Sequence, residues 1–531
     1  MAGDIGLDPT FHPPDGRVSL DFNNAVAVSP LRVQTDGRIL SVVSIGRPGG
    51  GTDFGIERLT PDGFPDPTFG TLGRSTISFA SDLVTPTNLA LQPDGKIVVV
   101  GTADLDFAAV RFTADGQPDT SFGAGGRVVI PYNAGGLNVD GALQVAVQAD
   151  GRIVVAGIVQ RTFPIRFFPG NNDIGLARLN ADGSLDGTFG VGGKVTFGFG
   201  GVTSEPAGLA VDPDGRVIVV GTGRPAVGID PADFQVARLR ADGSVDSSFG
   251  SGGVASVDFG AYDLPSGVSA LPDGRIVVGG STLLNSGVAR PVFARLTADG
   301  RPDATFDGDG KVYLPTLQSF YPAEMTVQPD GRIIALLGLS GLFSNSIGAG
   351  IVGLAADGTP DPTYLRANAT FGDDIPIARF AIQPFGGIIV QGSSPFQAGR
   401  NVVVARLAPT QAPIGELLER TPPQLVAAQA VFAGGRRRLT GVTLSFDEGL
   451  DPATVTADRF RLGVVVRRSR GKVTTRPLRV AAASYDANSG LVTLRAANKV
   501  AIPRGARIVI RPGLADLAGN ATTTQIVAFV R

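Results

Sequence analysis

The chain has 531 residues, of which 43% are hydrophobic and 18% charged, with one histidine and no cysteine. The lack of cysteine excludes disulfides, thiolate catalysis and cysteine-ligated metals. The net charge of −2 is uneven, because residues 415–531 carry 18 Lys+Arg and 8 Asp+Glu, a net of +10, which leaves −12 for the first 414 residues.

No apolar run approaches the roughly 18 residues that a membrane-spanning helix needs, so no membrane span is predicted. The opening residues, MAGDIGLDPTF, lack the basic and apolar regions of a signal peptide. Either the protein is cytoplasmic or its export signal is missing from this sequence. The absence of cysteine suits an extracellular bacterial protein, and we expect an extracellular or cell-surface location.

Three motifs recur in fixed order along the first 410 residues. The first is a P-D-G turn followed by a β-branched run, as in QPDGKIVVVG. Its copies begin at Gln34, Gln92, Gln148, Asp212, Leu271, Gln328 and Gln383, at intervals of 58, 56, 64, 59, 57 and 55 residues. The second motif resembles ARLTADG and the third DPTFG. Repetition at this period identifies a repeat architecture.

Each repeat predicts four strands. A short strand leads into the P-D-G turn, in which Pro presets φ and Gly takes a positive φ. The β-branched second strand and the third strand follow, and a second D-G turn leads to the fourth. Strands that are apolar on both faces fit sheets wedged between neighbours. The fold class predicted is all-β, with residues 1–410 forming a seven-bladed β-propeller of four-stranded blades. A linear β-solenoid is the alternative, but it normally uses shorter coils.

The two chain ends complement each other. The seventh repeat stops after ARLAPT, at residues 405–410, without its D-x-T-F segment. The chain opens with that segment, as LDPTFHPPDGRVSL from Leu7. We therefore expect residues 7–22 to supply the outer strand of the last blade and to remove a free sheet edge.

An arginine and an aspartate flank the second D-G turn at equal distances, which places them opposite each other on a hairpin. We predict structural cross-strand ion pairs at these positions. The pairs are Arg58 with Asp66, Arg111 with Asp119, Arg178 with Asp186, Arg238 with Asp246, and Arg295 with Asp303. In the sixth repeat Gly353 replaces the arginine, which predicts that Asp361 lacks a partner. In the seventh, Arg406 has only Asp8, from the other end of the chain.

The motifs QPDGKIVVxG, ARLxxDG and LDxTFG together resemble the delta-60 repeat family of bacterial proteins, over about residues 7–408. The resemblance implies a propeller and a bacterial, often surface-associated setting. It implies no catalytic residues.

A linker at residues 411–421 precedes a second domain, residues 422–531. Six or seven short alternating segments predict an antiparallel β-sandwich. The combination of LSFDEGLDPATV and GLADLAGN resembles bacterial immunoglobulin-like (Ig-like) domains, which implies a spacer or adhesion role. Its basic stretches, residues 436–438 and 467–472, suit either a solvated hairpin or an anionic polymer. No aromatic residues are interleaved with them, so nucleic-acid binding is not expected.

Catalytic candidates are few. His12 is the only histidine and occupies a turn, so a Ser-His-Asp triad or multi-histidine metal site is not expected. No cofactor is expected, although calcium could bind at acidic turns. The candidates are Asp307, Asp309, Asp516 and Asn520. In each case a plain turn is the alternative.

The connections opposite the D-G turns vary in length, and variable loops are where a propeller usually binds. The longest combines aromatic and polar residues, as a carbohydrate or peptide site would. These are Phe163, Arg166, Phe167, Phe168, Asn171 and Asn172. The alternative is a loop packed on its neighbour.

The sequence favours a non-catalytic, monomeric, bacterial surface or secreted protein for recognition or adhesion. It would bind a carbohydrate or protein ligand at the variable-loop face. The alternative is a propeller-type polysaccharide hydrolase or lyase, for which no catalytic carboxylate pair stands out.

Overall fold

A computed structural model describes residues 7–20, 28–47, 50–81, 83–132, 140–161, 172–200, 203–224, 233–283, 289–314, 320–339, 349–369, 377–384, 386–393, 402–407, 425–433, 438–446, 455–469, 472–486, 491–501, 506–510 and 526–530. The chain divides into two compact units, one made almost wholly of residues 1–413 and the other of residues 414–531. The predicted linker lies outside the described residues.

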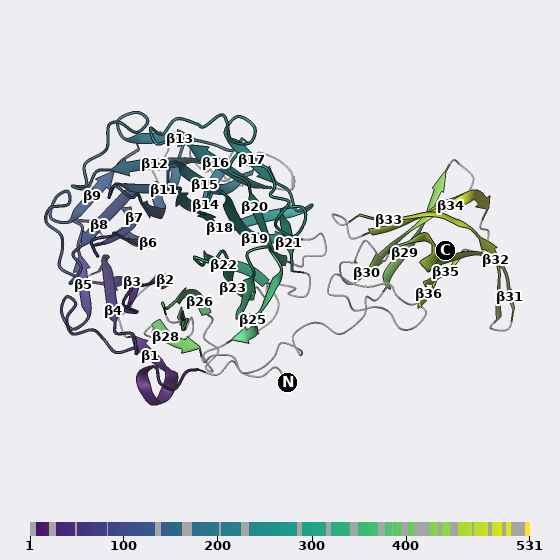
Figure 1. Ribbon diagram of the computed structural model, residues 1–531, viewed down its shortest axis with the longest axis horizontal. Coiled ribbons are helices and arrows are strands. Elements are labelled where there is room, and N and C mark those ends of the chain that lie inside the picture. Colours follow the sequence, from purple (N-terminus) through teal and green to yellow (C-terminus); the bar gives the residue numbers. More distant parts are fainter. Residues whose placement is uncertain are drawn as a thin grey trace. The chain divides into compact units, whose positions relative to one another are not determined.

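The first unit is built from sets of four strands, and the sets follow one another around a common centre (Figure 1). Within each set the strands are counted from the innermost to the outermost. The first, innermost strands are β2 (Val28–Val33), β6 (Val84–Leu91), β10 (Gly141–Val147), β14 (Thr203–Val211), β18 (Tyr262–Ala270), β22 (Phe320–Val327) and β26 (Ile377–Ile382). The second strands are β3 (Ile39–Gly46), β7 (Ile97–Ala103), β11 (Ile153–Gln160), β15 (Val217–Arg224), β19 (Ile276–Leu283), β23 (Ile333–Leu339) and β27 (Ile388–Ser393).

The third strands are β4 (Thr52–Leu59), β8 (Asp106–Phe112), β12 (Asn172–Leu179), β16 (Phe234–Leu239), β20 (Ala289–Leu296), β24 (Ala349–Leu354) and β28 (Val402–Leu407). The fourth strands are β5 (Arg74–Ile77), β9 (Arg127–Ile130), β13 (Lys194–Phe197), β17 (Val254–Val257), β21 (Lys311–Tyr313), β25 (Pro360–Ala369) and β1 (Arg17–Leu20). Neighbouring strands pair antiparallel, as hairpin connections require. Two sets of four form one eight-stranded sheet through a single parallel bridge, Asn172 to Thr203.

The P-D-G turns and the β-branched runs fold as their chemistry dictates. In the second repeat Gly95 has φ +83° and donates its N–H to the Gln92 carbonyl at 2.9 Å, which closes the turn. The strand that follows, β7, is buried on both faces, with Ile97, Val98, Val99 and Val100 at 0% exposure. A strand with apolar side chains on both faces buries them only when its sheet packs between two other sheets.

The last sheet of this unit combines both ends of the repeat region, in the order β1-β28-β27-β26. β1 pairs antiparallel with β28, with Val18 opposite Val404. The short helix η1 (His12–Gly16) precedes β1, and the Asp8 N–H donates to the Arg406 carbonyl at 2.8 Å. Residues 7–20 therefore cover the edge that β28 would otherwise expose.

The second unit contains two four-stranded antiparallel sheets and the short helix η4 (Ala457–Arg459). Its strands are β29 (Leu425–Ala433), β30 (Arg438–Phe446), β31 (Phe460–Ser469), β32 (Lys472–Leu478), β33 (Val480–Asp486), β34 (Leu491–Ala501), β35 (Ala506–Ile510) and β36 (Ile526–Val530). Both sheets contribute to one core, which includes Leu444, Leu494, Leu462 and Ile508. Eight strands are described, more than the six or seven expected. Of the basic stretch at residues 467–472, Arg467 and Arg468 lie in β31 and Lys472 opens β32, where it pairs with Ser469.

Candidate functional site: an axial pocket

A pocket of about 590 Å³ lies where the innermost strands of the first unit meet. Its lining comes from β2, β6, β10, β14, β18, β22 and β26. These are sheet edges, so their backbone groups have no further strand to pair with. Proline suits such an edge because it lacks the N–H, and Pro30, Pro86 and Pro265 all line the pocket.

A β-bulge in the innermost strands sets which side chains face the axis. The register of β6 shifts between Pro86 and Asn88, and that of β10 shifts between Ala142 and Gln144. A bulge bends its strand and re-aims the next side chain. The residues that follow the bulge at equivalent positions are Asn88, Gln144, Gly208, Gly267, Glu324 and Arg379, and all line the pocket.

A hydrogen-bonded chain of polar side chains spans one side of this pocket. Glu324 accepts the Phe380 N–H at 3.2 Å and pairs with the Arg32 guanidinium at 2.9 Å. Arg32 lies 3.5 Å from the Asn88 carbonyl oxygen, and the Asn88 amide donates to Gln144 at 2.9 Å. The negative charge of Glu324 and the positive charge of Arg32 offset each other. This wall therefore presents hydrogen-bond donors and acceptors with little net charge.

The other side of the pocket combines the backbone of Gly208 and Gly267 with neighbouring side chains, among them Leu209, Val268 and Met325. A Cβ on Gly208 would lie 3.0 Å from the Val268 nitrogen, and one on Gly267 would lie 3.1 Å from Met325 Cγ. A side chain at either position would be a tight contact, so glycine favours this close approach of neighbouring innermost strands. The pocket therefore combines a polar wall with an exposed peptide and thioether wall, an arrangement that binds polar, partly apolar molecules.

The pocket lies at the middle of the innermost strands. Its lining includes Leu143 to Val145 from the middle of β10 and Pro265 to Val268 from the middle of β18. Arg32, in the polar wall, lies only two residues before Gln34, where the turn after β2 begins.

Most of the predicted loop site lies outside the described residues, namely Phe163, Arg166, Phe167, Phe168 and Asn171. Asn172 opens β12 opposite Gln160, and its Oδ1 is buried without a hydrogen bond in the described structure. Of the calcium candidates, Asp516 and Asn520 also lie outside. Asp307 and Asp309 are exposed in a turn where the Asp309 carboxylate accepts the Lys311 N–H, as an ordinary turn would.

The structure brings together the arginine and aspartate of each predicted ion pair. The Nε–Oδ2 distance is 2.8 Å for Arg58–Asp66, and the same contact recurs at 2.7–2.8 Å for Arg111–Asp119, Arg178–Asp186, Arg238–Asp246, Arg295–Asp303 and Arg406–Asp8. Burial raises the pKa of Asp66, but hydrogen bonds from Thr68 and the Arg58 guanidinium outweigh it and bring the value to about 2.

These arginines make contacts that the sequence alone did not indicate. Arg58 lies 4.4 Å above the Phe69 ring and donates to the Ala114 carbonyl, in the D-G turn of the next sheet, at 2.6 Å. Arg111, Arg178, Arg238 and Arg295 donate to the equivalent carbonyls of Ala181, Ala241, Ala298 and Ala356. Each arginine therefore links its own hairpin to the neighbouring sheet.

The expectation that Asp361 lacks a partner is wrong. Arg332, which follows the P-D-G turn of the same sheet, lies 3.7 Å from the Asp361 carboxylate. The residue after P-D-G approaches the same aspartate elsewhere, as Arg38 does Asp66 at 2.9 Å. The basic residue in P-D-G-R was the signal for this second partner.

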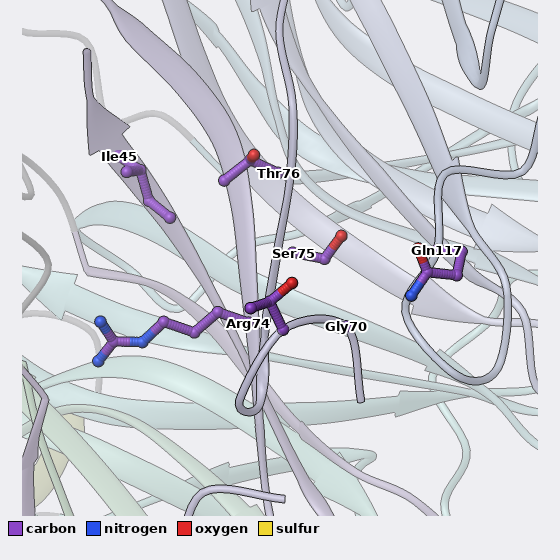
Figure 2. Close-up of a pocket in the computed structure, with 7 residues that line it drawn as sticks. Ile45, Gly70, Arg74, Ser75, Thr76 and Gln117 are labelled. Carbon is purple, nitrogen blue, oxygen red and sulfur yellow. The ribbon is translucent and has the colours of Figure 1, made fainter. Parts of the chain in front are cut away.

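A second pocket, of about 390 Å³, lies on the outer part of the first sheet (Figure 2). Figure 2 shows Arg74 extending away from Gln117, so its polar side chains do not converge. The Arg74 guanidinium lies 3.4 Å from Glu57, which is fully buried. Burial raises the pKa of Glu57 to about 7, despite the charge of Arg74. This pocket has the features of a packing gap rather than a binding site.

Within the part of the chain that the structure describes, no helix is long and apolar enough to cross a membrane.

No curated protein matches the sequence. Among solved structures, puromycin hydrolase is 15% identical, with a TM-score of 0.43, and the match covers 80% of this chain and 59% of that one. The chain thus spans 59% of the length of that hydrolase.

Two further structures are similar at the same level. The β-propeller domain of the Trilobed protease from Pyrococcus furiosus is 11% identical, with a TM-score of 0.41, over 74% of this chain and 98% of that one. A polysaccharide lyase, the PL25 ulvan lyase, is 8% identical, with a TM-score of 0.41, over 74% and 96%.

The family described as "Domain of unknown function (DUF5122) beta-propeller" matches five segments, residues 34–69, 92–122, 148–189, 213–249 and 271–306. Each segment runs from the end of an innermost strand to the D-x-[TS]-F motif, so the match follows the repeat. The repeats of the first unit are β-propeller repeats similar to those of this family.

Proposed function

We propose that residues 7–407 close into a seven-bladed propeller, with residues 7–20 completing the last blade. The contacts between the last and first sheets support this, because they repeat those between consecutive sheets. Gln383 donates to the Gly37 carbonyl at 3.2 Å, as Gln92 does to Gly151 at 3.2 Å. Arg406 donates to the Pro61 carbonyl at 3.3 Å, the counterpart of the Arg58 contact with the next sheet.

The N-terminal segment contributes two further contacts of the same kind. The His12 N–H donates to the Asp62 carbonyl at 2.7 Å, as Gly70 does to Asp115 at 2.7 Å. A Cβ on Gly63 would lie 2.6 Å from the Phe11 ring, which occupies the place that Phe69 takes against Gly116. A closed ring explains why the first and last sheets share this geometry.

We further propose that this propeller is a non-catalytic recognition or adhesion module that binds a carbohydrate in its axial pocket. The observation that carries this proposal is the polar wall of Glu324, Arg32, Asn88 and Gln144 opposite a wall of glycine backbone and apolar side chains. Paired amide and carboxylate groups match the adjacent hydroxyls of a sugar, and the second wall matches its apolar face. A volume of about 590 Å³ is ample for one or two sugar rings.

The proposed setting is a bacterial surface or secreted protein in which an Ig-like second unit acts as a spacer. A hydrolase or lyase would need two carboxylates, or a carboxylate with another acid or base, around the substrate. Among the described residues that line the pocket, Glu324 is the only carboxylate, and Arg32 and the Phe380 N–H hold it. This lining favours binding over bond cleavage.

A glycan array probed with the full chain tests the proposal. The wild-type protein should bind a limited set of glycans, and Gln144→Ala should weaken binding to them about tenfold. Arg301→Ala, which changes an 82% exposed side chain in a D-G turn, serves as the matched control. Arrays without any bound glycan, or equal binding by the Gln144 variant, would contradict a carbohydrate site in this pocket.

A further inference from the structure

At three junctions between repeats, a glutamine side chain links one P-D-G turn to the next. Gln92, which begins the turn of the second repeat, donates from Nε2 to the Gly151 carbonyl in the turn of the third repeat at 3.2 Å. Gln148 donates in the same way to the Gly215 carbonyl at 3.0 Å. The last sheet makes this contact with the first, as described above. Gln92 and Gln148 are only 8% and 5% exposed, so each side chain fills the space between two turns.

The fourth and fifth repeats have other residues at the position of this glutamine. Asp212 occupies it in the fourth repeat, and its carboxylate pairs with Arg216 of the same turn at 2.6 Å. Leu271 occupies it in the fifth repeat, and an aliphatic side chain has no hydrogen-bonding group. Leu271 therefore cannot supply an amide to Gly331, which takes the place of Gly151 in the next turn.

A pocket of about 740 Å³ opens at the junction where Leu271 replaces the glutamine. Leu271 and Val268 line it on one side, and Gly331 and Val327 on the other. These residues belong to β18, to β22 and to the turns that follow them, and β18 and β22 are neighbouring innermost strands (Figure 1). The lining residues exposed at the mouth of the pocket are Pro272, Asp273, Pro329 and Asp330. The pocket is thus open to solvent on the face of the P-D-G turns.

The lining of this pocket favours an uncharged ligand. Val277 and Ile333, which also line it, are each 1% exposed and provide an apolar interior. The charged side chains of the lining form ion pairs at 2.6–2.7 Å, namely Asp273–Arg275, Asp330–Arg332 and Arg295–Asp303. A charged ligand would lose its hydration and compete with these pairs, whereas a neutral amide would not.

We propose that this pocket binds a glutamine side chain of a partner protein. The amide donates to the Gly331 carbonyl, as the Gln92 amide does to Gly151, and the two methylene groups contact Leu271 and Val327. A glutamine within a peptide fits better than free glutamine, because the free amino acid carries two charges. The site is separate from the polar wall of the axial pocket, and its occupation goes beyond the proposed binding of a carbohydrate.

A library of capped hexapeptides, each with one fixed central residue, tests this site when it is probed with the full chain. Peptides with a central glutamine should bind about tenfold or more tightly than those with glutamate or leucine. Of these three side chains, only glutamine can donate an N–H to the Gly331 carbonyl, and glutamate would also have to bury a charge.

Leu271→Gln restores the residue that five of the seven repeats have at this position. The new side chain should occupy the pocket and weaken peptide binding about tenfold or more, while circular dichroism shows an unchanged fold. Leu271→Ala enlarges the pocket without supplying a donor, so it should keep the preference for glutamine over glutamate. Arg301→Ala, at an 82% exposed side chain, is the control and should bind as the wild-type protein does.

Three results would overturn the proposal. They are a library in which no hexapeptide binds, equal binding of glutamine and glutamate peptides, and unchanged binding by a folded Leu271→Gln variant. Loss of binding in Arg301→Ala would also overturn it, because the peptides would then bind at the D-G turns. If Leu271→Gln does not fold, the preference of the wild-type protein for glutamine over glutamate still decides the question.

Discussion

Arg406 and Asp8 form an ion pair, with Nε and Oδ2 2.8 Å apart, although 398 residues separate them in the chain. Arg406 also donates to Thr10 Oγ1 at 2.7 Å and stacks 5.4 Å above the Phe11 ring. The three equivalent groups, Asp66, Thr68 and Phe69, surround Arg58 within a single hairpin. The two ends of the repeat region thus reproduce a contact that is local everywhere else.

We predict that Arg406→Ala lowers the free energy of unfolding by about 2–3 kcal/mol, because it leaves the carboxylate of Asp8 without its cation. Chemical denaturation, followed by far-UV circular dichroism, measures the change. A double-mutant cycle with Asp8→Ala should give a coupling energy of about 1 kcal/mol or more. Additive effects of the two substitutions would show that the pair does not hold the chain ends together.

The sequence predicted the pairing of the chain ends because the missing D-x-T-F segment and the orphaned arginine are both local patterns. It did not predict the links between sheets, such as Arg58 to Ala114, because a backbone carbonyl carries no mark in the sequence. The axial pocket was missed for a related reason. Asn88, Gln144 and Glu324 follow bulges in short strands, and a bulge is invisible until the register is known.

Gly353 shows what a broken pattern can mean. An arginine there would donate to the D-G turn of the seventh repeat, but that repeat has Ala-Pro-Thr at residues 408–410 in place of the turn. The arginine and the turn sequence that carries its acceptor in the other repeats are thus replaced together. Both changes are visible in the sequence, but only the contacts of the other arginines connect them.

We predict that Gly116→Ala is strongly destabilising, by about 2–4 kcal/mol, since a Cβ there would lie 2.7 Å from the Phe69 ring and φ is +85°. Gly151→Ala is the control, because φ is +83° but nothing lies within 4 Å. It should cost only about 1 kcal/mol, from backbone strain alone. Thermal unfolding of both variants separates the cost of the Phe69 contact from the cost of backbone strain. Equal losses of stability in the two variants would mean that the Phe69 contact is unimportant.

Acid should unfold the first unit through its hairpin aspartates. Hydrogen bonds from Thr305 and Arg295 outweigh burial and lower the pKa of Asp303 to about 2, as happens at Asp66. A carboxylate with a lowered folded pKa stabilises the fold above its ordinary pKa, and that contribution disappears as pH falls through the lowered value. The midpoint of thermal unfolding should therefore drop between about pH 4 and pH 2. Asp303→Asn should show a shallower drop, and an unchanged slope would count against this pair.

Glu57 should give the opposite dependence. It is fully buried in β4, where the equivalent residues of neighbouring sheets are Val110 and Ala177, and burial raises its pKa to about 7. An acid with a raised folded pKa stabilises the fold fully at pH values below its ordinary pKa, and stability falls as pH rises through the raised value. Thermal unfolding should therefore occur at lower temperature at about pH 8.5 than at about pH 5.5.

Glu57→Gln removes the ionisation and should flatten this dependence, whereas Glu205→Gln should leave it as in the wild-type protein. At alkaline pH, Glu57→Gln should also be more stable than Glu205→Gln, because it no longer buries a charged carboxylate. The cation that pairs with Glu57, Arg74, is 3.4 Å away and partly exposed. Equal slopes in the wild-type protein and in Glu57→Gln would show that Glu57 does not titrate in this range.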